Sequence, residues 1–311
     1  MTRQGRRDGF QNKEVNSMKM NLLSFDIEEW YLNRQKGGPK EKYAEFDRYL
    51  DDILNKLYER KQKATFFCVG KMGQYFPEVI RKIQAQGHEI GCHSNIHTWL
   101  NKMTEAECRE DTHQAVDSLE QCIGEKVKSY RAPAFSIGEN NRWAFEILAE
   151  NGIERDASIF PAARDFGGFP HFGQKEPCIV DYNGIRMKEF PICTTKVLGK
   201  EMAYSGGGYF RFFPLGYVEK QIKKSSYAMC YFHIGDLVPG HKTIMSRERY
   251  EAYFKEKGTI KARLSRYMKS NLGKKNAFSK MMKLIDVMDF VNLQQADGMM
   301  DWTNTPIVSL G

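Results

Sequence analysis

Short apolar runs alternate along the chain with longer stretches in which apolar residues recur every three or four positions. The runs predict strands at 21–25, 64–69, 88–92, 129–132, 153–158, 187–190 and 229–233. The helical spacing predicts helices over 45–61, 77–86, 104–122 and 141–150. Strands that alternate with helices in this way are typical of βα units around a parallel sheet or barrel.

Residues 159–215 interrupt this alternation. The segment is rich in glycine, proline and aromatic residues, and it predicts an elaborated region of loops and strands. Within it, the three glycines at 206–208 favour a hairpin, although 205–211 could also form a loop that contacts a substrate. We therefore expect a disordered leader over 1–17, a main domain over 18–240 and a basic helical extension over 241–311 that packs on it.

The net charge of +8 comes from the two ends of the chain. Residues 1–17 hold 4 basic and 2 acidic residues and residues 241–311 hold 13 and 7, whereas residues 18–240 hold 30 of each. A neutral main domain argues against a nucleic-acid groove, so no nucleic-acid partner is expected. The basic tail could contact an anionic membrane surface, and the alternative is a solvated face with an unstructured leader.

The apolar segments and the cysteines predict a cytoplasmic protein. No apolar run approaches the roughly 20 residues of a membrane helix, and residues 1–17 lack the apolar core of a secretory signal. The seven cysteines show no CxxC or metal-type spacing, so we expect reduced and mostly buried thiols.

Ionisable side chains gather where the predicted strands end. In a (β/α) barrel the active site lies at the carboxyl ends of the strands, so residues that are distant in sequence can meet there. The candidates in such places are Asp26, Glu28, His93, His97, Arg131, Asp156 and His233.

Two spacings among these candidates have a chemical meaning. Side chains two apart in a strand share a face, so Asp26 and Glu28 point the same way and Glu29 points opposite. Two carboxylates on one face need a cation or a proton between them, unless they form a solvated acidic turn. If their segment is helical, His93 and His97 lie one turn apart, which is common for one divalent metal; otherwise both are ordinary histidines.

In their order along the chain, these segments resemble the NodB-type polysaccharide deacetylase family, carbohydrate esterase family 4. The family's first motif, T-F-D-D-G, stands here as SFDIEEW at 24–30, with Asp-x-Glu in place of Asp-Asp. The histidine motif is met by HSNIH at 93–97, the R-x-P motif by RAP at 131–133, and the last motif by FH at 232–233; DASIFP at 156–161 is a loose fourth. The details DIEEW, SGGGYFR and YFH resemble the branch associated with bacterial exopolysaccharide and capsule loci.

The resemblance implies a fold, a reaction and a set of roles. The fold is a distorted (β/α) barrel of about seven parallel strands. The reaction is metal-dependent hydrolysis of the N-acetyl group of an amino sugar in a bacterial poly- or oligosaccharide. The metal is zinc, with cobalt, nickel or manganese as alternatives, held by Glu28, His93 and His97, with Glu29 left open as a ligand. The other roles are a general base (Asp26), its orienting partner (Arg131), a general acid (His233), an orienting residue for that acid (Asp156) and an oxyanion N–H (Ala134).

Further residues could contact the glycan. Sugar faces stack on aromatic rings, and the candidates near the strand ends are Trp30, Tyr31, Trp99, Tyr209 and Phe210. Most aromatic residues belong to protein cores, which is the alternative for each of them. Arg211 could bind an anionic sugar or a lipid-linked phosphate.

Two other functions remain open at this point. One is a cytosolic amidohydrolase of the same fold that acts on a small cyclic amide, which the missing signal segment suits. The other is an inactive glycan-binding protein, which would be expected to have lost some of the candidate residues. For the deacetylase, the expected partner is an N-acetylated glycan, free or lipid-linked, at the inner face of the membrane.

Overall fold

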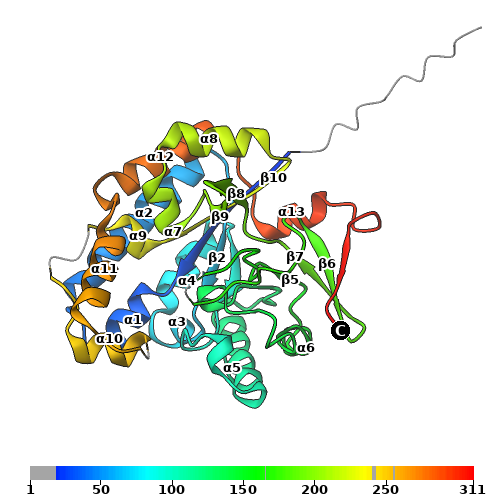
Figure 1. Cartoon of the computed structure of the whole chain (residues 1–311), viewed down its shortest axis with the longest axis horizontal. Coiled ribbons are helices and arrows are strands. Elements are labelled where there is room, and N and C mark those ends of the chain that lie inside the picture. Colours follow the sequence, from blue (N-terminus) through cyan, green and yellow to red (C-terminus); the bar gives the residue numbers. More distant parts are fainter. Residues whose placement is uncertain (1–18, 165, 240–242, 255) are drawn as a thin grey trace, which may run out of the picture.

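A computed structural model describes residues 19–311 apart from 165, 240–242 and 255. Its centre is one nine-stranded sheet (Figure 1). In spatial order the strands are β10 (Tyr227–His233), β1 (Met20–Ile27), β2 (Thr65–Cys68), β3 (Glu89–Cys92), β4 (Ser129–Tyr130), β5 (Arg155–Asp156), β7 (Ile185–Glu189), β6 (Cys178–Tyr182) and β11 (Ile307–Ser309). The expected leader and the expected boundary at 240 both lie outside the described residues, so the division into domains stays a prediction.

The first seven strands in this order, from β10 to β7, are all parallel to their neighbours. Strand β6 runs antiparallel to β7, and β11 pairs with β6 in parallel. The seven parallel strands confirm the expected α/β fold. Strands β6 and β11 were not predicted, because β6 lies in the irregular segment and β11 is only three residues long.

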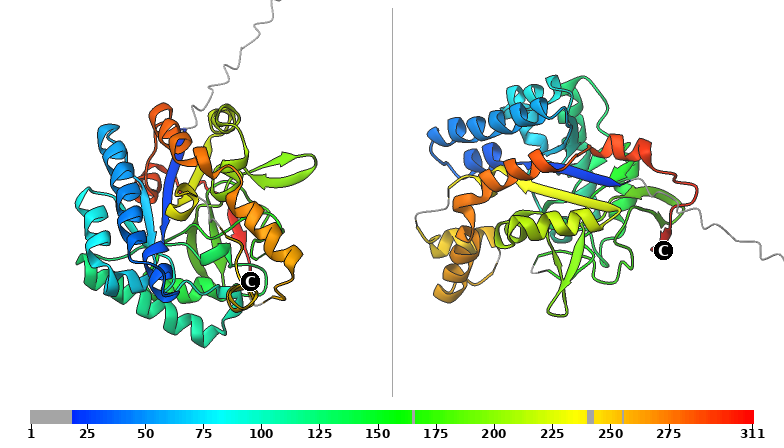
Figure 2. Two further views of the ribbon diagram at one scale, coloured as in Figure 1. Left: turned by 90° about the vertical axis from the view of Figure 1, so that its left-hand side faces the viewer. Right: turned by 90° about the horizontal axis from the view of Figure 1, so that it is seen from above.

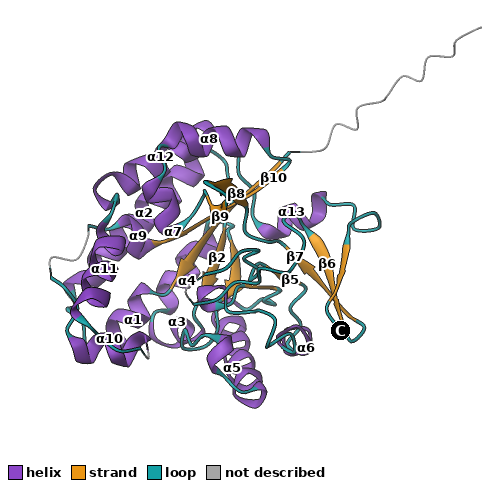
Figure 3. Cartoon of the chain, viewed as in Figure 1, coloured by secondary structure: helices purple, strands orange, loops and turns teal. Residues whose placement is uncertain are grey.

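Helices surround the sheet (Figures 2 and 3). They are α1 (Glu29–Gln35), α2 (Glu41–Glu59), α3 (Gly70–Tyr75), α4 (Pro77–Ala85), α5 (Glu105–Ile123), α6 (Ala144–Glu150), α7 (Gly207–Phe212), α8 (Leu215–Lys224), α9 (Ile234–Leu237), α10 (Arg247–Phe254), α11 (Ile260–Asn271), α12 (Ala277–Val287) and α13 (Leu293–Met299). Helix α5, which was predicted over 104–122, begins at a capping box in which Thr104 Oγ1 accepts from Glu107 N and the Glu107 carboxylate accepts from Thr104 N.

The strands next to the site are buried along most of their length, as parallel strands covered on both faces should be. All eight residues of β1 are buried, and so are the first six of β10. Phe25 stacks on Phe66 of β2 at 5.0 Å between ring centroids and lies 5.9 Å from Phe232 of β10. This packing fixes the register of the strands whose ends carry the site.

The glycine-rich segment forms helix α7 and not the hairpin favoured by its composition. A Cβ on Gly206 would lie 2.2 Å from the ring of Tyr231, so only glycine allows this close approach to β10. The two-stranded hairpin of this region lies just before it, in β8 (Thr194–Val197) and β9 (Lys200–Ala203). None of the described helices is long and apolar enough to cross a bilayer.

Candidate active site and metal centre

Most of the predicted site residues meet at the carboxyl ends of the parallel strands. Asp26 and His233 are direct register partners near the ends of β1 and β10. His93 follows β3, and Arg131 follows the neighbouring strand β4. The prediction that strand ends would gather these distant residues is confirmed.

Three donor atoms converge beside Asp26. Glu28 Oε2 lies 2.5 Å from His97 Nε2 and 3.6 Å from His93 Nε2. Among the described residues, Glu28, His93 and His97 are the one group of three His, Cys, Asp or Glu whose donor atoms lie close enough for one ion. Buried polar atoms normally have hydrogen-bond partners, but His93 Nε2 and Glu28 Oε2 have none. Two imidazoles and one carboxylate are a common zinc ligand set, so these residues fit a divalent metal.

The segment 93–97 is a loop and not the helical turn that would have explained its spacing. Ser94 and His97 both have positive φ values, 58° and 63°, and Ser94 Oγ accepts from His97 N at 3.0 Å. Asp111 of α5, which no motif in the sequence singles out, accepts from Asn95 N at 2.8 Å. The loop nevertheless brings the imidazoles of His93 and His97 together, as a helical turn would, with 5.2 Å between ring centroids.

The tautomer of His93 is set by its other ring nitrogen. Nδ1 lies 2.7 Å from the carbonyl oxygen of Arg131. Because a carbonyl can only accept, Nδ1 carries the proton and Nε2 presents its lone pair to Glu28. Such outer hydrogen bonds are how proteins orient metal-binding imidazoles.

Glu28 and Glu29 differ clearly in their surroundings. Burial opposes the ionisation of Glu28, but the charge of His97 and the close imidazole nitrogens of His93 and His97 hold the pKa of Glu28 well below its ordinary value. Glu29 points away and accepts from Gly235 N. Burial and the neighbouring charge of Glu28 raise the pKa of Glu29 to about 8. The geometry favours Glu28 as the metal ligand, as the strand argument predicted.

Asp26 is held by Arg131. The guanidinium donates from Nη1 to Asp26 Oδ1 and to Ser24 Oγ, both at 2.9 Å, and from Nε to the carbonyl oxygen of Ala157 at 3.2 Å. The side chain of Arg131 is completely buried and lies over the ring of Phe67. The other carboxylate oxygen, Asp26 Oδ2, faces His93 Nε2 at 3.9 Å and His233 Nε2 at 3.4 Å.

Asp236, and not Asp156, orients His233. His233 Nδ1 lies 2.9 Å from Asp236 Oδ2, one turn further along the chain. Burial disfavours the charged imidazole, but the hydrogen bond to Asp236 and the charge of Glu28 outweigh it and raise the pKa of His233 to about 10. The role predicted for Asp156 is wrong: its buried carboxyl accepts from Ser158 Oγ at 2.5 Å and lies beside Glu189, its register partner on the neighbouring strand β7.

Arg211 supports Asp236 from behind and is not placed to bind substrate. Its Nη1 lies 3.5 Å from Asp236 Oδ1 and donates to the carbonyl oxygen of Ser270 at 2.7 Å. Its side chain is 7% exposed, because the end of α11 covers it. The predicted contact with an anionic sugar is therefore replaced by a positioning role.

The aromatic candidates divide between core and surface. Trp30, Tyr31 and Phe210 are buried, and Trp30 Nε1 donates to Asp47 while its ring packs on Phe46. The predicted substrate contact of Trp30 is therefore wrong. Trp99 is only half-buried. Tyr209 is also half-buried, and its contact with substrate stays a prediction, as does the oxyanion role of Ala134 in the short helix Pro133–Phe135 (φ 55° at Ala134).

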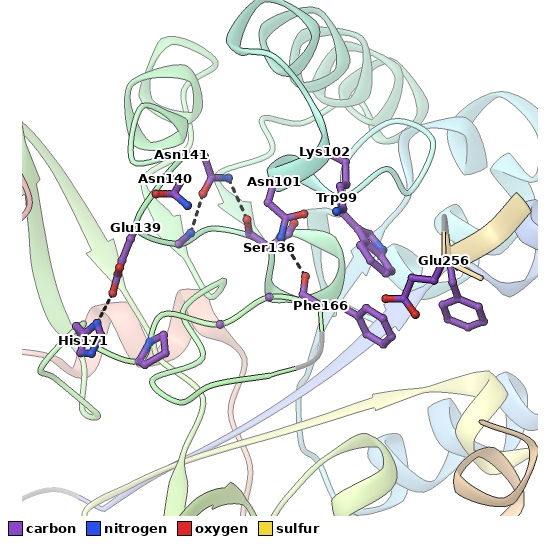
Figure 4. Close-up of a pocket in the computed structure, with 15 residues that line it drawn as sticks. Trp99, Asn101, Lys102, Ser136, Glu139, Asn140, Asn141, Phe166, His171 and Glu256 are labelled. Atoms are coloured by element: carbon purple, nitrogen blue, oxygen red, sulfur yellow. Dashed lines mark hydrogen bonds and ion pairs between the residues drawn. The ribbon is translucent and has the colours of Figure 1, made fainter. Parts of the chain in front are cut away.

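A cleft of about 430 Å³ is lined by residues that follow His97 and Ala134 along the chain (Figure 4). These include Trp99, two residues after His97, and Ser136, two residues after Ala134. Its aromatic wall continues from Trp99 to Phe166, 4.9 Å away, and from there to Phe254 at 5.7 Å between centroids. Its polar side carries Asn101, Glu139, Asn140, Asn141 and His171. Aromatic rings facing amide and carboxylate groups suit the apolar faces and hydroxyl groups of a sugar.

Two family models together match most of the chain. Residues 18–155 match polysaccharide deacetylases, and residues 157–297 match a domain of unknown function, DUF3473. The first segment contains Asp26, Arg131 and the candidate metal ligands. The second contains His233 and Asp236, so the site is assembled from both.

Curated relatives match over part of their length. A peptidoglycan-N-acetylglucosamine deacetylase of Bacillus cereus is 37% identical over 99 residues, which are 32% of this chain and 36% of the relative. A chitooligosaccharide deacetylase of Bradyrhizobium sp. is 26% identical over 98 residues, 32% of this chain and 42% of the relative. The chain thus spans less than half of the length of these relatives.

A solved structure shows the same fold. The crystal structure of a candidate polysaccharide deacetylase from Mycobacterium smegmatis aligns with a TM-score of 0.56 at 17% identity, over 93% of each chain. Residues 18–155, a little less than half of the chain, match the polysaccharide deacetylase family that the sequence motifs resemble.

Proposed function

We propose that the protein is a metal-dependent hydrolase that removes the N-acetyl group from an amino sugar of a glycan and releases acetate. One observation carries the proposal. Asp26 Oδ2 faces both His93 Nε2, a candidate metal ligand, and His233 Nε2. A base, an acid and a metal-binding group thus meet at one point at the open end of the strands, which amide hydrolysis requires.

The candidate ligands Glu28, His93 and His97 suit zinc. When bound, such a metal supplies a Lewis acid for the acetyl carbonyl and lowers the pKa of a water molecule. The remaining steps belong to the side chains of the protein.

Asp26 is the general base that takes the proton of the attacking water. Its Oδ1 is occupied by Arg131, which leaves Oδ2 for the proton. Because Arg131 is buried and held by two further acceptors, Ser24 Oγ and Ala157 O, the position of Asp26 is fixed before substrate arrives. The N–H of Ala134 would donate to the oxyanion of the tetrahedral intermediate.

His233 is the general acid that protonates the leaving amine. Asp236 accepts from Nδ1 and favours the imidazolium, so Nε2 carries a proton at neutral pH. A general acid must also face the reacting bond. His233 Nε2 faces Asp26, the proposed base, and so points into the space where the amide would lie. Arg211 in turn holds Asp236.

The cleft supports an oligosaccharide substrate over a small cyclic amide. Its volume of about 430 Å³ and its three aromatic rings suit a sugar unit next to the reacting one. The relatives named above act on peptidoglycan N-acetylglucosamine and on chitooligosaccharides, which supports an N-acetylated glycan. We further propose that this glycan is modified in the cytoplasm, free or on a lipid carrier, which the free and buried cysteines support.

Acetate and free amine released from chitooligosaccharides and peptidoglycan fragments test the function. We expect release by the zinc-loaded protein and a loss of about a hundredfold or more in an Asp26→Asn variant. Ring opening of small cyclic amides without acetate from any glycan would establish the amidohydrolase instead. Glycan binding without either reaction would establish an inactive binding protein.

A further inference from the structure

Helix α11 presents a row of large apolar side chains to solvent. Ile260, Leu264, Met268 and Leu272 recur every fourth residue, and they are 75%, 43%, 63% and 56% exposed. Side chains four apart lie on one face of a helix, so the four form a continuous stripe. Scattered exposed apolar residues are ordinary, but a contiguous stripe indicates a contact surface.

The opposite face of α11 is fixed to the body of the protein. Arg263 donates to the carbonyl oxygens of Gly258 and Met245, at 3.2 and 3.1 Å. Arg266 lies over the rings of Phe166 and Phe254, 4.6 Å from each centroid. Because the inner face is already used, the apolar stripe cannot turn inward without breaking these contacts. It faces outward as part of the folded structure.

The segment of sequence that carries the stripe is strongly basic. Residues 257–285 contain nine lysine and arginine residues and no aspartate or glutamate. Two of these, Lys261 and Lys269, are exposed on the same helix. On a helical wheel Lys261 lies on the apolar face, between Met268 and Leu272, and Lys269 lies at its edge, beside Leu272. The outer face of α11 is therefore both apolar and cationic.

We infer that the outer face of α11 docks the protein on an anionic phospholipid surface. Amphipathic helices with lysine and arginine beside a broad apolar face lie in the plane of the lipid headgroups, with the apolar side chains at the acyl boundary. Lysine residues next to that face pair with anionic headgroups. A nucleic acid would use the charges but leave the apolar stripe in water. A second copy of the chain, packed α11 against α11, would bring two cationic faces together.

The position of α11 means that docking on a phospholipid surface would also orient the candidate active site. The helix lies with α10 at the end of the molecule where β1 and β10 finish (Figure 2). Its last turn accepts from Arg211, which holds Asp236, which in turn orients His233. Docking through α11 thus brings the catalytic end toward glycans held at the membrane. The inference does not depend on the reaction proposed above.

Vesicle co-sedimentation of the full chain tests the inference. We expect binding to vesicles of phosphatidylcholine with about 30% phosphatidylglycerol, weaker binding in high salt, and none to pure phosphatidylcholine. The double variants Leu264→Ser/Met268→Ser and Lys261→Glu/Lys269→Glu should each bind at least tenfold more weakly. Matched controls on the β8–β9 hairpin, Leu198→Ser (the leucine is 99% exposed) and Lys200→Glu, should bind like wild type.

Three outcomes would overturn the inference. The first is no binding of the wild-type protein to anionic vesicles, and the second is unchanged binding of both α11 variants. The third is a dimer in solution that Leu264→Ser/Met268→Ser converts to a monomer without a change in vesicle binding, which would make α11 an interface between copies. Acetate release from a soluble oligosaccharide should be the same in wild type and in the α11 variants, so a failure of the proposed reaction is seen separately.

Discussion

Asp26 and His233 are register partners on neighbouring parallel strands, and their facing atoms, Oδ2 and Nε2, lie 3.4 Å apart. Each has a second partner on its far side, Arg131 for Asp26 and Asp236 for His233. The pairing of β1 with β10 therefore places a fixed base next to a fixed acid. It also joins the polysaccharide deacetylase segment to the domain of unknown function in one site.

Replacing Asp236 by asparagine should move the alkaline limit of activity to lower pH. Against the effect of burial, the hydrogen bond to Asp236 and the charge of Glu28 raise the pKa of His233 to about 10; the acid form is the active one, so activity should persist until the pH passes that value. Without the charge, the pKa should fall toward its ordinary value and activity should decline from about pH 7 upward. Profiles of kcat/KM against pH for wild type, Asp236→Asn and the exposed control Asp52→Asn measure this. Identical alkaline limbs for all three would show that Asp236 does not act through His233.

Isosteric substitutions separate Glu28 from Glu29 as metal ligand. Glu28→Gln removes the charged oxygen that faces both histidines, so we expect at least a tenfold loss of zinc affinity. Glu29→Gln keeps the hydrogen bond from Gly235 N and should bind zinc like wild type. Competition with a chromogenic chelator gives both affinities. Loss of zinc in Glu29→Gln alone would transfer the ligand role to Glu29.

Trp99 should contribute to binding of the glycan and not to the chemical step. Replacing its ring by alanine removes stacking worth about 0.5–1.5 kcal/mol, so KM should rise roughly two- to tenfold with little change in kcat. Tyr58→Ala, at an exposed residue of α2, is the matched control. A KM for oligosaccharides that is the same in Trp99→Ala and wild type would mean that the substrate does not enter the cleft.

The buried pair of Asp156 and Glu189 should make stability depend on pH. Burial raises the pKa of both groups in the folded protein, and the charge of Asp156 raises that of Glu189 further. Their contribution to the free energy of unfolding is therefore complete below about pH 4 and is lost as the pH rises through the raised pKa values. Each unit by which a pKa is raised corresponds to about 1.4 kcal/mol of lost stability. Glu189→Gln keeps a hydrogen-bond donor for Asp156 and needs no proton, so its unfolding free energy should change less between pH 5 and pH 9. Chemical denaturation at pH 5 and pH 9 measures this in wild type, Glu189→Gln and the exposed control Glu125→Gln. An equal change in unfolding free energy in all three proteins would contradict the role of the buried pair.

Much of the site could be predicted because it follows from strand geometry. The two-residue spacing of Asp26 and Glu28 and the apolar runs before His93, Arg131 and His233 place polar groups at one edge of a parallel sheet. That argument needs only local patterns. Because side chains alternate along an extended strand, the same geometry turns Glu28, and not Glu29, toward the histidines.

The errors concern contacts that local patterns do not contain. Asp156 ends a buried strand, as a catalytic residue would. Its neighbour Glu189 lies on another predicted strand, and nothing in the sequence indicated that these two strands are adjacent in the sheet. The spacing of His233 and Asp236 was a usable signal, because residues three apart meet within one helical turn. The burial of Trp30 and Arg211 depends on the packing of α2 and α11, which no spacing in their own segments indicates.

The central claim is best tested by measuring bound metal and released acetate in the same samples of wild type, His93→Ala and the exposed control His113→Ala. We predict about one equivalent of zinc and acetate release from N-acetylated oligosaccharides for wild type and the control, and the loss of both for His93→Ala. Acetate release by a metal-free His93→Ala protein at the wild-type rate would contradict a metal-dependent deacetylase.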